Sequence, residues 1–205
     1  MTLLFIFDMD DVLYEYDWRV RMAGMTDLTG LSLDELRRLW WNDRGEWAAE
    51  AGAYRTGEEY LAAFQAAIGQ SIAEDDWVRV RGEAMTAWPK SLEAVRRASE
   101  LGRVTLLTNN GALVGEHLET LAPELVPLFG GEHLFTSSHY GARKPDPVVF
   151  ERVLEAYGTA PEDAFFADDM RVNVEGAESV GITSYRFGTP EGLLAAIEAF
   201  AASRA

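Results

Sequence analysis

An unbroken run of five apolar residues, Leu3 to Phe7, constrains the fold of this chain more than any other feature. A strand with one face in water alternates apolar and polar side chains. An unbroken apolar run is instead typical of a strand covered on both faces, as in a parallel sheet between helices. Asp8 and Asp10 follow this run directly. We therefore expect two acidic side chains at the carboxyl end of a buried strand, where open α/β sheets bind ligands.

The close spacing of these two acids leads to a chemical prediction. Carboxylates crowded into one place repel each other unless a cation or bound protons offset their charge. Magnesium prefers hard oxygen ligands of this kind. The pattern indicates a Mg²⁺ site beside a carboxylate that can act as a nucleophile.

From residue 88 onward, helical and strand patterns alternate. Helical patterns cover residues 89–101, 146–158, the stretch up to 180 and the chain from 190, and strand patterns cover 103–107, 164–167 and 182–185, with a short one near 134–135. Strands separated by helices of this length form βαβ units. We predict an α/β fold with a Rossmann-like, three-layer α/β/α core, whose parallel sheet includes the first strand.

Residues 15–87 differ, because their apolar positions keep helical spacing throughout. Three sites fit a capping box, in which a Ser or Thr at a helix start is followed three residues later by Glu. They are Ser32 with Glu35, Thr56 with Glu59, and Ser71 with Glu74. No strand is expected in this stretch. We predict an all-helical cap at residues 15–87, inserted after the first strand, and an α/β core formed by residues 1–14 and 88–205.

The composition limits the partners of the protein. The chain has 18 Lys and Arg against 34 Asp and Glu, a formal net charge of −16, which argues against nucleic acid or an anionic membrane as a partner. It contains no cysteine, so disulfides, thiol nucleophiles and zinc–thiolate sites are excluded. No apolar run reaches the length of a membrane span, and no basic leader precedes the first strand. We therefore expect a soluble cytoplasmic protein, either a monomer or a homodimer.

Four groups of polar residues are predicted at strand ends or just beyond them. They are Asp8 with Asp10, Thr108 with Asn109, Lys144, and Asp168 with Asp169. If the sheet is parallel, all four meet at one edge. In this order and at this spacing, they resemble the motifs of the haloacid dehalogenase superfamily in its helical-cap subclass, over essentially the whole chain. Within that superfamily, the segments 50–52 and 168–177 resemble bacterial sugar-phosphate phosphatases of the glucose-1-phosphatase type.

The resemblance implies how the acidic residues would work. Asp8 would attack phosphorus and form an aspartyl-phosphate, which water later hydrolyses. Asp10 would protonate the leaving alkoxide and then accept a proton from the attacking water. Mg²⁺ would be held by the Asp8 carboxylate, the backbone carbonyl of Asp10 and an acid of the fourth group. Asp169 is the primary choice for that last ligand, and Asp168 is the second.

The resemblance also implies how phosphate would be bound. Thr108 and the backbone N–H of Asn109 would hold it, and Lys144 would balance its charge during catalysis. The implied partner is a small phosphorylated metabolite, with a sugar phosphate favoured. Three alternatives stay open: a phosphomutase of the same superfamily, a 2-haloacid dehalogenase, and a non-catalytic metabolite-binding module. Asp10 favours phosphate over halide, because a halide leaving group needs no proton.

Overall fold

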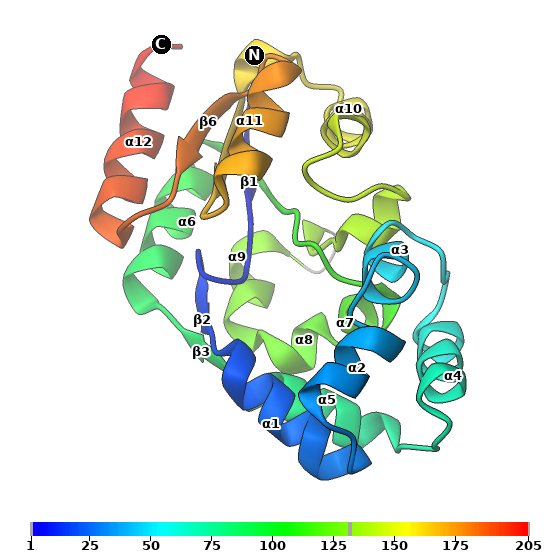
Figure 1. The fold of residues 1–205 in the computed structure, drawn as a ribbon. Coiled ribbons are helices and arrows are strands. Elements are labelled where there is room, and N and C mark those ends of the chain that lie inside the picture. Colours follow the sequence, from blue (N-terminus) through cyan, green and yellow to red (C-terminus); the bar gives the residue numbers. More distant parts are fainter. Residues whose placement is uncertain (1, 131–132, 205) are drawn as a thin grey trace.

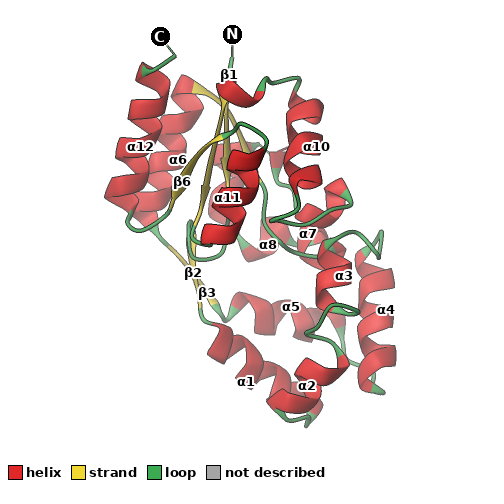
Figure 2. Ribbon diagram, turned by 45° about the horizontal axis from the view of Figure 1, so that its top comes forward, coloured by secondary structure: helices red, strands yellow, loops and turns green. Residues whose placement is uncertain are grey.

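The computed structural model describes residues 2–130 and 133–204. Its main sheet has parallel strands in the order β4-β1-β5-β6, so β1 lies inside the sheet, as its apolar sequence predicts. Helices cover both faces of this sheet (Figure 2). The strands are β1 (Leu3–Phe7), β4 (Gly102–Leu106), β5 (Ala164–Asp168) and β6 (Thr183–Arg186). The flanking helices are α6 (Pro89–Leu101), α10 (Pro147–Tyr157), α11 (Arg171–Ser179) and α12 (Pro190–Ala202).

Alternate side chains of β1 enter two different apolar clusters. Phe5 and Phe7 belong to a cluster that includes buried residues of α6 and α12. Leu4 and Ile6 belong to a second cluster with buried residues of α10 and α11. Burial on both faces is why the run of apolar residues is unbroken. The predicted α/β fold with a three-layer core is confirmed.

The segment between β1 and α6 is mostly helical, as predicted. Its helices are α1 (Trp18–Thr29), α2 (Leu33–Leu39), α3 (Glu46–Glu50), α4 (Gly57–Ile68) and α5 (Glu74–Gly82). The expectation that this stretch contains no strand is wrong. Two short strands, β2 (Tyr14–Tyr16) and β3 (Met85–Ala87), pair antiparallel where the chain enters and leaves the helical segment. The pairing satisfies backbone groups of the two connections, which run side by side.

Two of the three predicted helix starts are confirmed. Ser32 forms the full capping box of α2, and the Thr56 side chain caps α4. Ser71 does not cap α5, which begins at Glu74 without a side-chain cap. Three acidic residues in the first turn of α5 interact favourably with the positive end of that helix instead.

The connection from β4 to α10 contains short helical pieces. They are α7 (Ala112–Glu116), α8 (Leu118–Leu121), α9 (Val126–Phe129) and the 3₁₀ turns at Pro123–Leu125 and Ser137–Tyr140. A further 3₁₀ turn, Pro161–Asp163, precedes β5. The prediction of a strand near residues 134–135 is wrong. Thr136 makes only a single bridge, to Thr108, because the chain turns into a 3₁₀ helix at the next residue.

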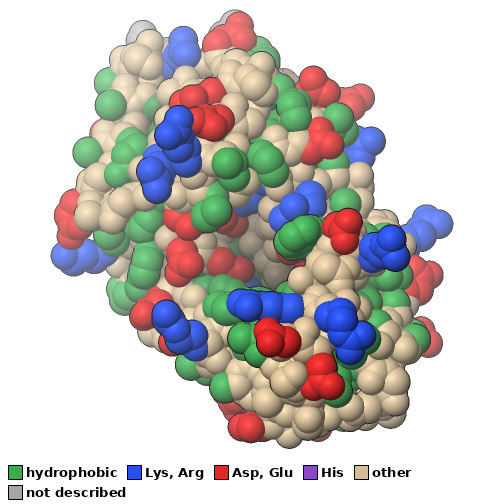
Figure 3. Space-filling view, viewed as in Figure 1, with side chains coloured by type: hydrophobic (Ala, Val, Ile, Leu, Met, Phe, Trp, Pro, Cys, Tyr) green, Lys and Arg blue, Asp and Glu red, His purple; other side chains and the backbone are tan. Residues whose placement is uncertain are grey.

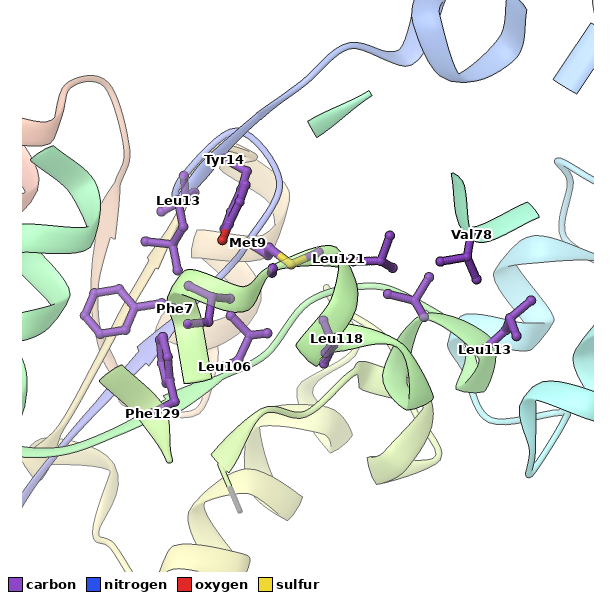
Figure 4. Packing of buried hydrophobic residues seen from close by; sticks show 14 of the residues in the cluster. Phe7, Met9, Leu13, Tyr14, Val78, Leu106, Leu113, Leu118, Leu121 and Phe129 are labelled. Atoms are coloured by element: carbon purple, nitrogen blue, oxygen red, sulfur yellow. The ribbon is translucent and has the colours of Figure 1, made fainter. Parts of the chain in front are cut away.

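One apolar cluster joins the sheet to the helical segment. In Figure 4, its side chains run from Phe7 of β1 past Met9 and Leu121 toward Val78 of α5. The helical segment therefore has no separate core. Both termini lie at the end of the molecule opposite to α1 and α2 (Figure 1). Among the described residues, no helix combines the length and the apolar character needed to cross a bilayer.

Candidate active site

The carboxyl ends of the parallel strands point toward a hollow between the sheet and the helices α1 and α2. Figure 3, seen from the same side as Figure 1, shows this hollow near the centre of one face. Acidic side chains gather at its left rim, and Lys or Arg side chains lie at its other rims. The polar groups predicted from the sequence lie at this edge of the sheet.

Lys144 is fully buried between two carboxylates. Its Nζ lies 2.9 Å from Oδ1 of Asp8 and 2.6 Å from Oδ2 of Asp168. Burial lowers the pKa of Lys144, but Asp168 and Asp8 raise it more, so the pKa is above its usual value and the amine stays protonated. Asn109 fixes the backbone at this point, because its side-chain amide exchanges two hydrogen bonds of 2.9 Å with the N–H and C=O of Lys144.

The carboxylate of Asp168 accepts hydrogen bonds from several protein donors. Besides Lys144, it accepts hydrogen bonds from Nδ2 of Asn173 at 3.0 and 3.1 Å and from the backbone N–H of Met170 at 2.8 Å. The carboxylate of Asp169 is hydrogen-bonded to no donor among the described residues. The two neighbouring acids therefore differ: Asp168 anchors Lys144, and Asp169 is available to a ligand.

Asp8, Asp168 and Asp169 form a cluster that suits a metal ion. Each offers a carboxylate oxygen, and these oxygens lie within 4.8 Å of one another. Burial raises the pKa of Asp8 well above its usual range; Lys144 opposes this shift, and Asp168 adds to it. Burial, with Asp168 and Asp11 nearby, raises the pKa of Asp169 to about 6. A divalent cation would reverse both shifts, and these hard oxygen donors fit Mg²⁺.

Asp10 is held by an arginine from the helical segment. Nη2 of Arg81 donates to both carboxylate oxygens of Asp10 at 2.7 Å, and the guanidinium lies 4.0 Å from the centre of the Tyr16 ring. The next residue, Asp11, has φ 57°, a left-handed conformation that Asp tolerates better than most residues. Its carboxylate accepts a hydrogen bond from the N–H of Tyr16 at 3.1 Å, which stabilises the turn after β1.

Thr108 lies two residues after the end of β4 and is almost fully buried. Its Oγ1 accepts a hydrogen bond of 2.8 Å from Nδ2 of Asn110, so the hydroxyl proton can point to another acceptor.

Close packing holds the loop that carries Lys144. A Cβ on Gly176 of α11 would lie 2.4 Å from the carbonyl oxygen of Pro145, so only glycine lets the helix approach this loop.

Comparison with known proteins agrees with this fold. The sequence pattern of the haloacid dehalogenase-like hydrolases matches residues 2–181. The chain belongs to this family. One relative is the phosphatase MT3486 of Mycobacterium tuberculosis, which is 28% identical to this chain. The match covers 88% of this chain and 84% of the relative.

Two solved structures share the fold. One is the HAD family enzyme bt-2542 from Bacteroides thetaiotaomicron in complex with magnesium and inorganic phosphate, with a TM-score of 0.75, 20% identity, and coverage of 90% of this chain and 93% of the other. The second is a 2-haloacid dehalogenase from Pseudomonas syringae, with a TM-score of 0.66, 17% identity and full coverage of both chains. At these identities, both show the fold of a haloacid dehalogenase-like hydrolase and nothing finer.

The structure of this haloacid dehalogenase-like hydrolase shows further residues at the site, which the sequence analysis missed. Arg81 is one, although it lies four residues after Trp77, on the buried face of α5; a charged residue at an apolar helical position was the available signal. Glu50 and Arg143 are a second case. Nε of Arg143 lies 2.6 Å from Oε2 of Glu50, which ties α3 to the residue before Lys144.

Proposed function

We propose that the protein is a Mg²⁺-dependent phosphatase that acts on a small phosphorylated metabolite through an aspartyl-phosphate at Asp8. The observation that carries this proposal is the buried ion pair between Asp8 and Lys144, within a cluster of carboxylates that suits a divalent cation. The likeness to a mycobacterial phosphatase supports the same activity. Sugar phosphates are the favoured substrates, on the resemblance of residues 50–52 and 168–177.

The helical character of the segment between β1 and α6 supports a division of the chain into a cap and a core. Residues 15–87 would act as the cap, and residues 1–14 and 88–205 as the catalytic core. The hollow lies between the sheet and the cap helices α1 and α2 (Figure 3). A substrate bound at the ends of the strands would therefore contact the cap with its leaving group.

In the first step, a carboxylate oxygen of Asp8 bonds to phosphorus, and the bond from phosphorus to the leaving oxygen breaks. Asp10, which is protonated before this step, gives its proton to that oxygen. In the second step, water attacks phosphorus, Asp10 takes a proton from it, and the bond to Asp8 breaks.

The remaining residues of the site would act on the phosphoryl group. Lys144 stabilises the negative charge on its oxygens. Thr108 and the backbone N–H of Asn109 bind the same oxygens. Mg²⁺, held by the Asp8 carboxylate, the Asp10 carbonyl and Asp169, with Asp168 as the second choice, would offset the repulsion between nucleophile and phosphate.

Phosphate release from p-nitrophenyl phosphate tests the activity. We expect turnover with Mg²⁺, none with EDTA, and none in Asp8→Asn. Acid quenching during turnover should trap a protein heavier by one phosphoryl group, which hydroxylamine removes. Asp11→Asn is the matched control, because it changes a neighbouring acid without removing the nucleophile. Turnover that survives Asp8→Asn would contradict the proposal.

Two further assays address the finer predictions. A panel of phosphorylated sugars, nucleotides and organic acids should show the highest kcat/KM for sugar phosphates, and a flat profile would contradict that preference. Halide release from 2-chloropropionate tests the dehalogenase alternative. We expect none, because the metal-suited acid cluster serves phosphate chemistry.

A further inference from the structure

A cluster of buried cations and aromatic side chains in the helical segment lies against Asp10. Arg21 of α1 and Arg81 of α5 are each only 2% exposed. Arg81 pairs with Asp10. Nη1 of Arg21 donates instead to the backbone carbonyl of Trp77 at 3.1 Å, and its guanidinium lies 4.2 Å from the centre of the Trp77 ring. Within the described part of the chain, Arg21 forms no ion pair, unlike Arg81.

This cluster has more donors than acceptors. Nη1 of Arg81 and Nε1 of Trp77 are both buried, and neither has a hydrogen-bond partner in the described structure. Such unpaired buried donors are rare and unfavourable in folded proteins. Arg21 contacts Trp77, which lies one helical turn before Arg81 on α5, so the two arginines belong to one cluster. Burial lowers the pKa of Arg21.

The nearby carboxylate of Glu46 is already engaged. Its Oε2 accepts hydrogen bonds of 2.6 Å from Nε1 of Trp40 and from the hydroxyl of Tyr60. In the described structure, Arg81 is therefore bonded directly to one anion, Asp10, and Arg21 to none. Glu46 and Asp10 balance the two arginines in charge, so protonation of Asp10 leaves Arg81 without a bonded anion.

The proposed chemistry removes that anion from Arg81. Both oxygens of Asp10 accept from the same nitrogen, Nη2, and Asp10 must be protonated on one of them to act as the general acid, which removes its negative charge. A buried guanidinium left without its counter-ion is strongly unfavourable. The group bonded to that leaving oxygen, however, arrives beside Asp10 and hence beside Arg81.

We propose that the leaving group of the substrate carries a second anionic group, a carboxylate or a phosphate, which replaces Asp10 at Arg81 with Arg21 beside it. This inference rests on the proposed phosphatase function and narrows its substrates to phosphorylated sugar acids or sugar bisphosphates. A carboxylate or phosphate can accept bonds from Nη1 and Nη2 together. A neutral hydroxyl cannot supply the lost negative charge.

Matched pairs of substrates test the proposal through the ratio of kcat/KM within each pair. The first pair is 3-phosphoglycerate and glycerol 3-phosphate, which differ by a carboxylate in place of a hydroxymethyl group. The second is fructose 1,6-bisphosphate and fructose 6-phosphate, which differ by the second phosphate. We expect the wild-type protein to favour the anionic member of at least one pair by about tenfold or more. The pair that shows it identifies the anion as carboxylate or phosphate.

Variants then assign the preference to the arginines. Arg81→Met should bring the ratio close to one, and Arg81→Lys should keep part of it. Arg21→Met should lower the ratio while leaving the contact between Arg81 and Asp10 in place, which covers the case that Arg81→Met does not fold. Arg38→Met is the matched control, because Arg38 is an exposed arginine of α2 outside the cluster, and its ratio should equal that of the wild type.

Turnover of p-nitrophenyl phosphate separates the two levels of inference. If the wild-type protein hydrolyses it but neither pair shows a preference, the inference is overturned and the phosphatase function stands. The same holds if Arg81→Met and Arg21→Met slow all four substrates equally, since that would give the arginines a structural role only. If the wild-type protein hydrolyses none of these compounds, the proposed function fails, and the inference fails with it.

Discussion

Asp168 and Asp169 are neighbours in sequence with opposite surroundings, and their substitutions should differ accordingly. Asp168→Asn removes a carboxylate 2.6 Å from the fully buried Lys144, so we expect it to lower the free energy of unfolding by about 3 kcal/mol. Asp169→Asn should leave that free energy nearly unchanged and instead raise the Mg²⁺ concentration needed for activity. Urea unfolding and Mg²⁺ titration of turnover measure the two effects, and equal loss of stability in both variants would contradict the assignment.

Glu50 should make stability depend on pH. Burial, with Glu46 nearby, raises its pKa to about 8, although Arg143 opposes the shift. The folded protein thus binds this proton more tightly than the unfolded chain does. The contribution to stability is full below about 4.5, the usual pKa, and is lost as pH rises through about 8.

Glu50→Gln removes this dependence, because glutamine does not titrate. The free energy of unfolding of Glu50→Gln, relative to the wild type, should therefore increase between about pH 5 and about pH 9. Urea unfolding at both pH values measures it. Taking the difference between the two proteins cancels the other acids, and a difference that does not change with pH would show that Glu50 stays ionised beside Arg143.

At the residue scale, the sequence predicts best what lies at strand ends. Asp8 and Asp168 meet because the carboxyl ends of β1 and β5 share one edge, and a strand is recognisable from a few consecutive residues. Lys144 lies in the loop before α10, where Asn109 holds its backbone beside them. Arg81 could not be placed in this way. Its partner Asp10 is 71 residues away in the sequence, and the contact depends on how α5 packs against the loop after β1.

Among the elements, α1 and α5 pack unusually closely at Gly24. A Cβ there would lie 2.6 Å from Cγ1 of Val80, a stiff β-branched side chain that precedes Arg81. Gly24→Ala should therefore destabilise the fold by about 1 kcal/mol net, because the clash outweighs the gain in helix propensity. Displacement of α5 should also move Arg81 from Asp10 and slow turnover.

A double-mutant cycle tests this packing. Val80→Ala makes room, so Gly24→Ala should cost less in that background, with an interaction energy of about 1 kcal/mol. Gly82→Ala is the matched control on α5, since its Cβ would meet only Cδ2 of Leu121 at an ordinary 3.5 Å. Additive effects of the two substitutions would mean that α1 and α5 adjust freely.

The elements that the sequence did not predict are those without a local signal. β2 and β3 are three residues each, and they pair only because the ends of the helical segment meet in space. The strand expected near residues 134–135 did not form, although its apolar residues gave a local signal. Its apolar residues are not followed by enough extended chain to form more than one bridge. Long periodic helices and strands buried on both faces were predictable, because their pattern reflects burial directly.

For the whole molecule, the net charge of −16 and the acid cluster both attract Mg²⁺. Both favour the cation, so Mg²⁺ should stabilise the folded protein, by about 2.7 kcal/mol at a concentration one hundred times its dissociation constant. We expect the midpoint of thermal unfolding to rise by about 5 °C or more, and EDTA to reverse the rise. Adding NaCl should increase the Mg²⁺ concentration required, because salt screens the attraction.

Two variants separate the site from the overall charge. Asp169→Asn removes one negative charge inside the cluster and should abolish most of the thermal response. Asp75→Asn removes one negative charge from the exposed first turn of α5 and should keep the response almost intact. If both variants lose the response equally, Mg²⁺ acts as a diffuse counter-ion of an acidic protein. A loss confined to Asp169→Asn would instead place the ion at the ends of β1 and β5, beside the proposed nucleophile.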